Sequence, residues 1–297
     1  MPDVKGRRGW RAALLVVLLA LGLGGASVAA AKPPIWVVRS PKATLVLFGS
    51  VHLLPAGLDW RPAALDDAIA KASEIWFELP IDAATNNQAA QIALARGALP
   101  KDRRLSALLT PVQLARLDQA AAALNCPPTA LDRMQPWMAD LTLSVADDVR
   151  GGATASDGVE EQLQALAPPT AQRRAFETAA EQIEFLAGAS IPDQVASLNE
   201  TVAEIDDDPA AYQRIVGEWI SGDVAGLRRD AIDPVARASP RLYDRLISRR
   251  NHRWARILGA RLASPGAIVV VVGVGHLVGP EGLPALLRAQ GFQVEGP

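Results

Sequence analysis

The chain has 297 residues, of which 49% are hydrophobic and 21% are charged, and its formal net charge is −2. This composition is typical of a globular protein with a large core, and it excludes a disordered chain. Lys and Arg do not outnumber Asp and Glu, so we expect no nucleic-acid partner. The single cysteine, Cys126, excludes a disulfide within the chain.

Residues 1–31 have the pattern of an export signal peptide. A basic segment, KGRRGWR, precedes the apolar segment AALLVVLLALGLGG and the small residues ASVAAA. An uncleaved membrane anchor is the alternative, but the apolar segment is shorter than the ~20 residues that span a bilayer. We therefore predict an exported protein, periplasmic or secreted, with no stable membrane span after signal cleavage.

The first part of the mature chain predicts a strand–helix–strand unit. IWVVRS (35–40) and ATLVLFGSV (43–51) are β-branched runs separated by Pro-Lys, which predicts two adjacent strands. RPAALDDAIAKAS (61–73) has helical periodicity, and EIWFELP (74–80) reads as a further strand. The apolar character along whole strands favours a parallel sheet that is buried on both faces.

The rest of the chain predicts a helical middle followed by a return to the sheet. From about 81 to 263 the pattern is helical, with one candidate short strand, RRAFET, at 173–178. The chain ends with AIVVVVGVG, EGLPALLRAQ and FQVE, which predict strand, helix and strand. The predicted fold is therefore α/β: residues 32–297 form one domain whose central, mostly parallel sheet is built from the N- and C-terminal segments, with a long helical insertion between them.

Two of the three histidines occupy the same local setting. His52 in GSVH and His276 in GVGH each follow an apolar run that stops at a glycine, three residues before the histidine. Carboxyl ends of parallel strands share one edge of a sheet, where ligands bind. If the two strands are neighbours or nearly so, the imidazoles converge there.

Glu78 extends this candidate site. It lies near the end of the otherwise apolar segment 74–80, where an unpaired carboxylate is costly. If that strand lies beside strand 43–51, Glu78 emerges at the same edge as His52. A carboxylate beside imidazoles acts as a general base or as a metal ligand.

The segments that carry these residues resemble the TraB/GumN family, which includes the Tiki-type proteases and is related to erythromycin-esterase-like proteins. DGVEEQL, FETAAEQIEFL, WISGD and RRNHRWARIL are similar to its internal blocks and occur in the same order. The resemblance implies a site of His52, Glu78 and His276, and metal-dependent proteolysis in Tiki-type members. Further matches to family positions are Glu160, Glu177, Arg250 and Asn251. This chain departs from the family in Ser-Val-His for Thr-Ile-His and in Gly-Val-Glu for Gly-Ile-Asp.

These residues predict hydrolysis of a peptide or small-molecule substrate. His52, Glu78 and His276 could hold one divalent ion (Mn, Co or Zn) that lowers the pKa of a bound water to ~7. Without a metal, Glu78 and one histidine could activate water directly. Arg250 and Asn251 could clamp a substrate carboxylate or an oxyanion, or could belong to an exposed basic helix face. The alternative function is a non-catalytic periplasmic binding protein for a peptide, a signal or a polysaccharide precursor.

Overall fold

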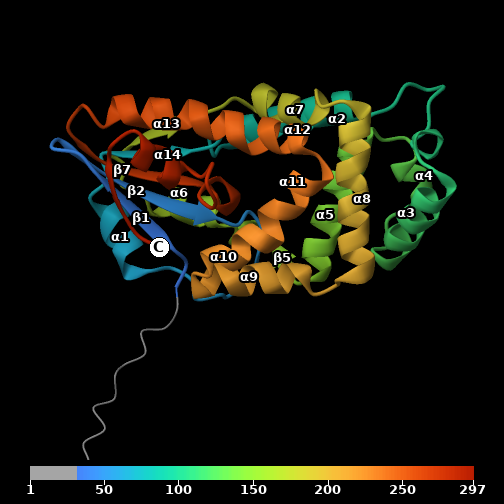
Figure 1. The fold of residues 1–297 in the computed structure, drawn as a ribbon, viewed down its shortest axis with the longest axis horizontal. Coiled ribbons are helices and arrows are strands. Elements are labelled where there is room, and N and C mark those ends of the chain that lie inside the picture. Colours follow the sequence, from blue (N-terminus) through green and yellow to red (C-terminus); the bar gives the residue numbers. More distant parts are fainter. Residues whose placement is uncertain (1–31) are drawn as a thin grey trace, which may run out of the picture. The chain divides into compact units, whose positions relative to one another are not determined.

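The computed structural model describes residues 32–297 (Figure 1). The predicted signal peptide, residues 1–31, lies outside the described residues. None of the helices in the described part has the length and apolar character needed to cross a membrane.

The strands form a main sheet and a small second one. Their bounds are β1 Ile35–Arg39, β2 Ala43–Ser50, β3 Leu54–Pro55, β4 Glu74–Phe77, β5 Ala153–Thr154, β6 Gln172–Ala175, β7 Gly266–Gly273 and β8 Gln293–Glu295. Within residues 32–297 the main sheet has six strands in the order β6-β4-β7-β2-β1-β8, and β3 pairs with β5.

The core of the main sheet is parallel, as predicted. Strands β6, β4, β7 and β2 run in the same direction, whereas β1 is antiparallel to β2 and to β8. The N-terminal and C-terminal segments therefore share one sheet, which confirms the α/β class. Strand β4 does not lie beside β2, however, because β7 is inserted between them. This places Glu78 next to the strand that leads to His276 and one strand further from His52.

Helices fill the long segment between the two parts of the sheet and also cover its faces. Their bounds are α1 Ala63–Ala70, α2 Ala83–Gly97, α3 Pro111–Ala123, α4 Pro128–Leu131, α5 Pro136–Arg150, α6 Val159–Leu166, α7 Ala179–Ala187, α8 Ile191–Asp207, α9 Ala211–Ser221, α10 Val224–Leu227, α11 Asp233–Ala238, α12 Pro240–Tyr243, α13 Arg249–Arg261 and α14 Leu283–Ala289. Short 3₁₀ or π segments are η1 Ser106–Leu108, η2 Ala155–Asp157, η3 Arg228–Ile232, η4 Asp244–Ser248 and η5 Val274–His276.

Helices cover both faces of the sheet. Because successive side chains of a strand point to opposite faces, the apolar side chains along β2 contact the two helical layers alternately. On β2, Val46 and Phe48 face the cluster formed with α1, α6 and α9, whereas Leu45 and Leu47 face α13 and α14. The same alternation occurs on β7. An uninterrupted apolar strand is therefore what this layered arrangement requires.

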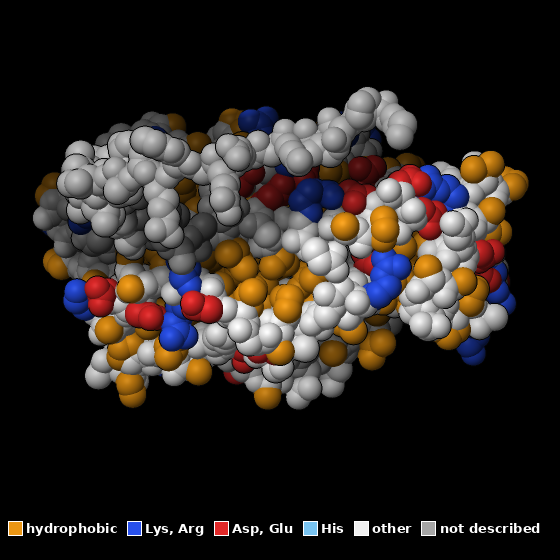
Figure 2. Space-filling view, turned by 90° about the horizontal axis from the view of Figure 1, so that it is seen from below, with side chains coloured by type: hydrophobic (Ala, Val, Ile, Leu, Met, Phe, Trp, Pro, Cys, Tyr) orange, Lys and Arg blue, Asp and Glu red, His pale blue; other side chains and the backbone are white. Residues whose placement is uncertain are grey.

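The helical insertion has its own core. Helices α3, α5 and α8 bury apolar side chains against one another, including Leu117, Leu143 and Leu198. In Figure 1, α8 lies between α5 and the pair α3 and α4. At the surface, charged side chains of both signs are interspersed: Arg214, for example, pairs with Asp208 and Asp230. Figure 2 shows blue and red groups around a hollow where hydrophobic side chains gather.

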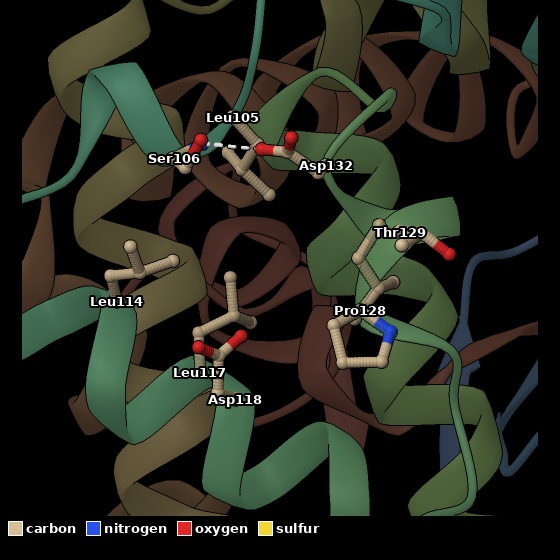
Figure 3. A pocket seen from close by; sticks show the side chains of 9 residues that line it. Leu105, Ser106, Leu114, Leu117, Asp118, Pro128, Thr129 and Asp132 are labelled. Atoms are coloured by element: carbon tan, nitrogen blue, oxygen red, sulfur yellow. Dashed lines mark hydrogen bonds between the residues drawn. The ribbon is translucent and has the colours of Figure 1, made fainter.

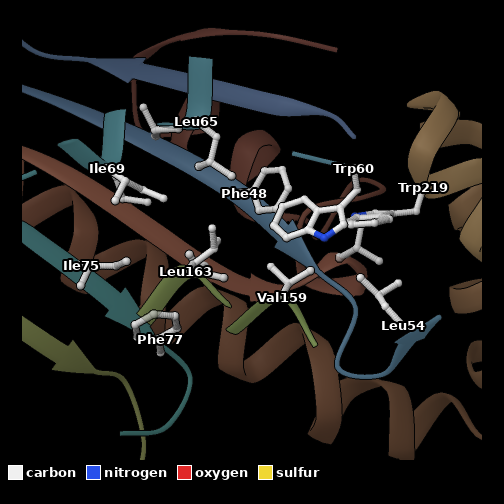
Figure 4. Packing of buried hydrophobic residues seen from close by; sticks show 14 of the residues in the cluster. Phe48, Leu54, Trp60, Leu65, Ile69, Ile75, Phe77, Val159, Leu163 and Trp219 are labelled. Atoms are coloured by element: carbon white, nitrogen blue, oxygen red, sulfur yellow. The ribbon is translucent and has the colours of Figure 1, made fainter. Parts of the chain in front are cut away.

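An aromatic cluster holds the carboxyl end of β2 in place. The ring centroids of Phe48 and Trp60 lie 5.6 Å apart, and those of Trp60 and Trp219 lie 5.5 Å apart. Figure 4 shows these rings together above the sheet. The indole N–H of Trp219, on α9, also donates a hydrogen bond of 2.9 Å to the carbonyl of Gly49. Helix α9 is thereby tied to the strand end that leads to His52.

We predict that Trp219→Phe destabilises the fold more than Trp137→Phe does. Both tryptophans are buried, but the N–H of Trp137 donates to no group among residues 32–297. Loss of the Trp219 donor removes a buried hydrogen bond to the Gly49 carbonyl, which costs about 1–3 kcal/mol. For a domain of this size the melting temperature should fall by about 2–4 °C per kcal/mol. Equal losses in the two variants, measured by thermal unfolding, would contradict this role.

Candidate active site

The four neighbouring parallel strands each deliver a polar residue to one edge of the sheet. Glu177 follows β6 by two residues, Glu78 directly follows β4, His276 ends η5 after β7, and His52 follows β2 by two residues. The pairing of β4 with β6 continues past the strand ends, since Glu177 N donates to Glu78 O at 3.0 Å. The predicted meeting of two imidazoles with a carboxylate at a shared edge therefore has the right topology.

His52 is oriented by Glu160. The start of α6 is held beside β2 because Val159 N donates to the carbonyl of Val51 at 3.2 Å. This places a Glu160 carboxylate oxygen 2.6 Å from His52 Nδ1. The carboxylate raises the pKa of His52 to about 9. Glu160 thus accepts from His52 Nδ1 and favours the imidazolium form, while 68% of the His52 side chain remains exposed.

His276 has the opposite character. Asn251 Nδ2 donates to the carbonyls of His276 and Glu281, so the Asn251 amide oxygen must be the group that accepts from His276 Nδ1 at 2.6 Å. His276 Nε2 then carries a lone pair, which accepts a hydrogen bond of 3.0 Å from Arg250. Burial, with the Arg250 charge adjacent, lowers the pKa of His276 to about 3. His276 is thus a buried, neutral imidazole.

Glu78 lies between the two histidines. Its Oε1 accepts from Gly273 N at 2.7 Å, and its Oε2 accepts from Arg250 at 2.6 Å and from Gln182 at 3.1 Å. Burial alone would raise its pKa, but the neighbouring imidazoles, the guanidinium and the Gly273 N–H hold the pKa of Glu78 at about 2. Glu78 is therefore ionised throughout the neutral range.

Gly273 provides the space in which the three side chains meet. A Cβ atom built at this position would lie 3.2 Å from Glu78 Oε1 and 3.8 Å from both His276 Cδ2 and His52 Nε2. At Gly49, a Cβ would lie 2.8–3.0 Å from side-chain and backbone atoms of Val274. The two glycines of the G-x-x-H motifs therefore allow close approach: Gly49 between β2 and η5, and Gly273 between the site residues.

Arg250 joins the site to the helical insertion. It lies in the first turn of α13, and its guanidinium donates to Glu177, Glu78, the carbonyl of Leu246 and His276. Glu177 has a fully buried side chain and also accepts from Arg253 at 3.1 Å. The buried Arg250 and Asn251 both bond groups within the protein. This differs from the expected clamp on a substrate, because their polar atoms are already engaged.

A cavity of about 330 Å³ opens onto this edge of the sheet. Its lining combines His52 and Glu78 with residues of the loop after β4 and of three helices: Leu79, Pro80, Ile81, Asn86, Glu160, Glu161 and Gln182. Sequence reasoning did not find Asn86, Glu161 or Gln182, since a single polar residue on a helix carries no signal of what it faces. His276 lies behind the cavity wall. A second hollow, between α3 and α4, is lined by four leucines and by polar residues that include Asp118 and Asp132 (Figure 3).

The arrangement does not fit a divalent ion held by His52, Glu78 and His276. Glu78 Oε1 and His276 Nε2 lie 3.8 Å apart, but Arg250 occupies the lone pair of that nitrogen and also binds Glu78. An ion between them would have to displace the guanidinium. Within residues 32–297, no group of three or more His, Cys, Asp or Glu side chains has metal-binding geometry.

Comparisons with known proteins agree with the resemblance inferred from the motifs. The model of the TraB/PrgY/gumN family matches residues 34–296. Two curated relatives, each described as uncharacterized protein YbaP, come from Escherichia coli K12 and Shigella flexneri. Each is 25% identical over 244 residues, covering 82% of this chain and 87% of the relative. No solved structure matches the chain significantly.

We predict that His52 titrates near pH 9 and that Glu160→Gln moves its midpoint down towards the ordinary value of about 6.5. Removing the carboxylate removes the charge that stabilises the imidazolium. The measurement is imidazole NMR chemical shift against pH, which is simple in a chain with 3 histidines. Glu161→Gln, which alters the neighbouring acid, serves as the control and should leave the midpoint unchanged. A wild-type midpoint near 6.5 would refute the coupling.

Proposed function

Since the chain belongs to the TraB/PrgY/gumN family, we propose that it is an exported hydrolase whose acid–base site consists of His52 and Glu78. One observation carries the proposal: His52, bound to Glu160, and Glu78, bound to Arg250 and to the Gly273 N–H, line the same cavity. Hydrolysis needs a proton donor for the leaving group and an acceptor for the proton of water, and this pair supplies both.

The proposed reaction assigns one proton transfer to each residue. As water attacks a substrate carbonyl, its proton passes to Glu78 Oε1, which accepts one hydrogen bond, from Gly273 N, and so has a further lone pair for the proton. His52 Nε2 gives its proton to the leaving nitrogen or oxygen, while Glu160 keeps hold of Nδ1. The proton on Glu78 then returns to His52, which restores the starting state. His276 and Arg250 act as positioning residues, because they contact Glu78 but do not line the cavity.

This is the metal-independent route of the two that the sequence allows. The route through a metal on His52, Glu78 and His276 would require Arg250 to leave both Glu78 and His276. We therefore assign the proton transfers to the protein's own side chains.

The cavity favours a substrate with a positive charge. Glu78, Glu160 and Glu161 contribute three carboxylates to its lining, whereas His52 contributes one cation. His52 and Glu160 neutralise each other, and Glu78 is paired with Arg250 behind the wall. Glu161 has no ion-pair partner among the described side chains and is exposed. It is the group best placed to attract a cationic substrate.

We predict that His52→Ala and Glu78→Gln each lower hydrolysis by about 10²–10⁴-fold, the usual contribution of a positioned acid or base. The assay is a panel of peptide and ester substrates, carried out on purified mature protein in the presence of a chelator. His252→Ala is the matched control, since this exposed histidine pairs only with Glu281 among the described residues.

A different outcome would favour the binding-protein alternative. If the wild-type chain hydrolyses no member of the panel, yet a ligand from it stabilises the wild type and not His52→Ala, the site binds without catalysis. Unfolding temperatures of all three variants separate loss of chemistry from loss of fold.

We predict that Glu161→Gln lowers kcat/KM for a cationic substrate about fivefold relative to a neutral one, the effect of an exposed charge interaction worth about 1 kcal/mol. The change should diminish at high salt, because the charge is exposed. Glu200→Gln is the control, since Glu200 lines a different hollow, beside α8 and α11. An equal effect on neutral and cationic substrates would rule out charge selection by Glu161.

A further inference from the structure

We propose that Arg250 is the resident cation of this site and that its guanidinium fills a cage in which a divalent metal would otherwise bind. The wild-type chain then has no high-affinity metal site at this position. Removing the guanidinium should convert the cage into one. This inference concerns binding and stability, so it can be tested independently of the proposed hydrolysis.

Every N–H donor of the Arg250 guanidinium has an acceptor within the protein. Nε donates to Glu177 Oε1 at 2.8 Å, and Nη2 donates to Glu177 Oε2 at 2.8 Å and to Glu78 Oε2 at 2.6 Å. Nη1 donates to Leu246 O at 2.9 Å and to His276 Nε2 at 3.0 Å. An arginine has five N–H donors, so none is left for a substrate.

The cage also encloses the guanidinium from outside its plane. Its carbon lies 4.8 Å from the ring centroid of Trp254 and 5.1 Å from that of Phe185, at distances typical of cation–π contact. Only 9% of the Arg250 side chain is exposed. The two aromatic rings and the carboxylate acceptors thus surround the guanidinium, and both kinds of group stabilise a cation at this position.

The acceptors that surround the guanidinium are also metal ligands by type. Two carboxylates, one neutral imidazole nitrogen and one carbonyl oxygen are donor types that suit Zn²⁺ or Mn²⁺. In their present positions around the guanidinium they do not have metal-binding geometry, so binding requires them to move inward once the guanidinium is removed. Asn251 already holds His276 with Nε2 turned inward, which is the role of an outer-shell partner in metal sites. In the absence of Arg250, Arg253 beside Glu177 would be the guanidinium that remains next to the two buried carboxylates, and a divalent ion would relieve the repulsion between them.

The test measures metal binding to the metal-free wild type and to Arg250→Ala by calorimetry, with Zn²⁺ and Mn²⁺ as probes. The wild type should bind neither ion at this site, and a chelator should leave its melting temperature unchanged. Arg250→Ala should bind one equivalent of Zn²⁺ and gain stability as Zn²⁺ is added. Guanidinium chloride at low millimolar concentration should stabilise this variant too and compete with Zn²⁺, since both would occupy the same volume.

Two further variants make the result decisive. Arg253→Ala is the matched control, because it removes another guanidinium that contacts Glu177 from α13 but leaves the cage filled; it should not bind metal. If Arg250→Ala does not fold without metal, refolding of this variant in the presence of Zn²⁺ takes its place, because the cage then keeps both carboxylates. The proposal is overturned if the wild type binds one equivalent of metal that His276→Ala abolishes. It is equally overturned if a folded Arg250→Ala variant binds neither Zn²⁺ nor guanidinium.

Discussion

The buried ion-pair network of Arg250 with Glu78 and Glu177 is the interaction on which the site depends. Burial by itself raises the pKa of both carboxyl groups, and the guanidinium opposes this in each case. Removing one member of a buried pair leaves an uncompensated charge, which typically costs about 3–5 kcal/mol. Because Arg250 comes from α13 and the two acids come from strand ends, the same contacts that set the ionisation of the site also fasten the helical insertion to the sheet.

Different neighbouring groups explain how one repeated motif produces two different histidines. His52 and His276 occupy the same position after a glycine, yet Glu160 raises the pKa of the first, while burial and Arg250 lower that of the second. One ring is an exposed cation that can give up a proton, and the other is a neutral acceptor that holds Arg250 in place. The motif therefore determines the position of each imidazole ring, whereas the neighbouring groups determine its protonation state.

The same distinction separates what could be predicted from the sequence and what could not. Two apolar runs that stop at Gly49 and Gly273 predicted strands whose ends bring His52 and His276 to a shared edge. Glu78 was expected at this edge if β4 lay beside β2, and it reaches the edge beside β7 instead. The position of β7 between β4 and β2 could not be predicted, because a β-branched run indicates a strand but does not indicate which strands pair with it. The partners of Arg250 and Glu160 were also hidden, because they depend on how α6 and α13 pack against the sheet.

The proposed proton transfers and the proposed choice of substrate depend on different parts of this fold. The side chains that we propose to react, His52 and Glu78, follow strands of a sheet that is buried on both faces. Other residues around the cavity come from the loop after β4 and from α2, α6 and α7, and substitution of an exposed one, Asn86 or Glu161, changes the cavity wall without disturbing a strand. Proton transfer requires that its donor and acceptor keep their positions closely. The charge and shape of a cavity wall, by contrast, can change one substitution at a time. A sheet edge covered by a helical insertion therefore allows the substrate to change while the site geometry is preserved.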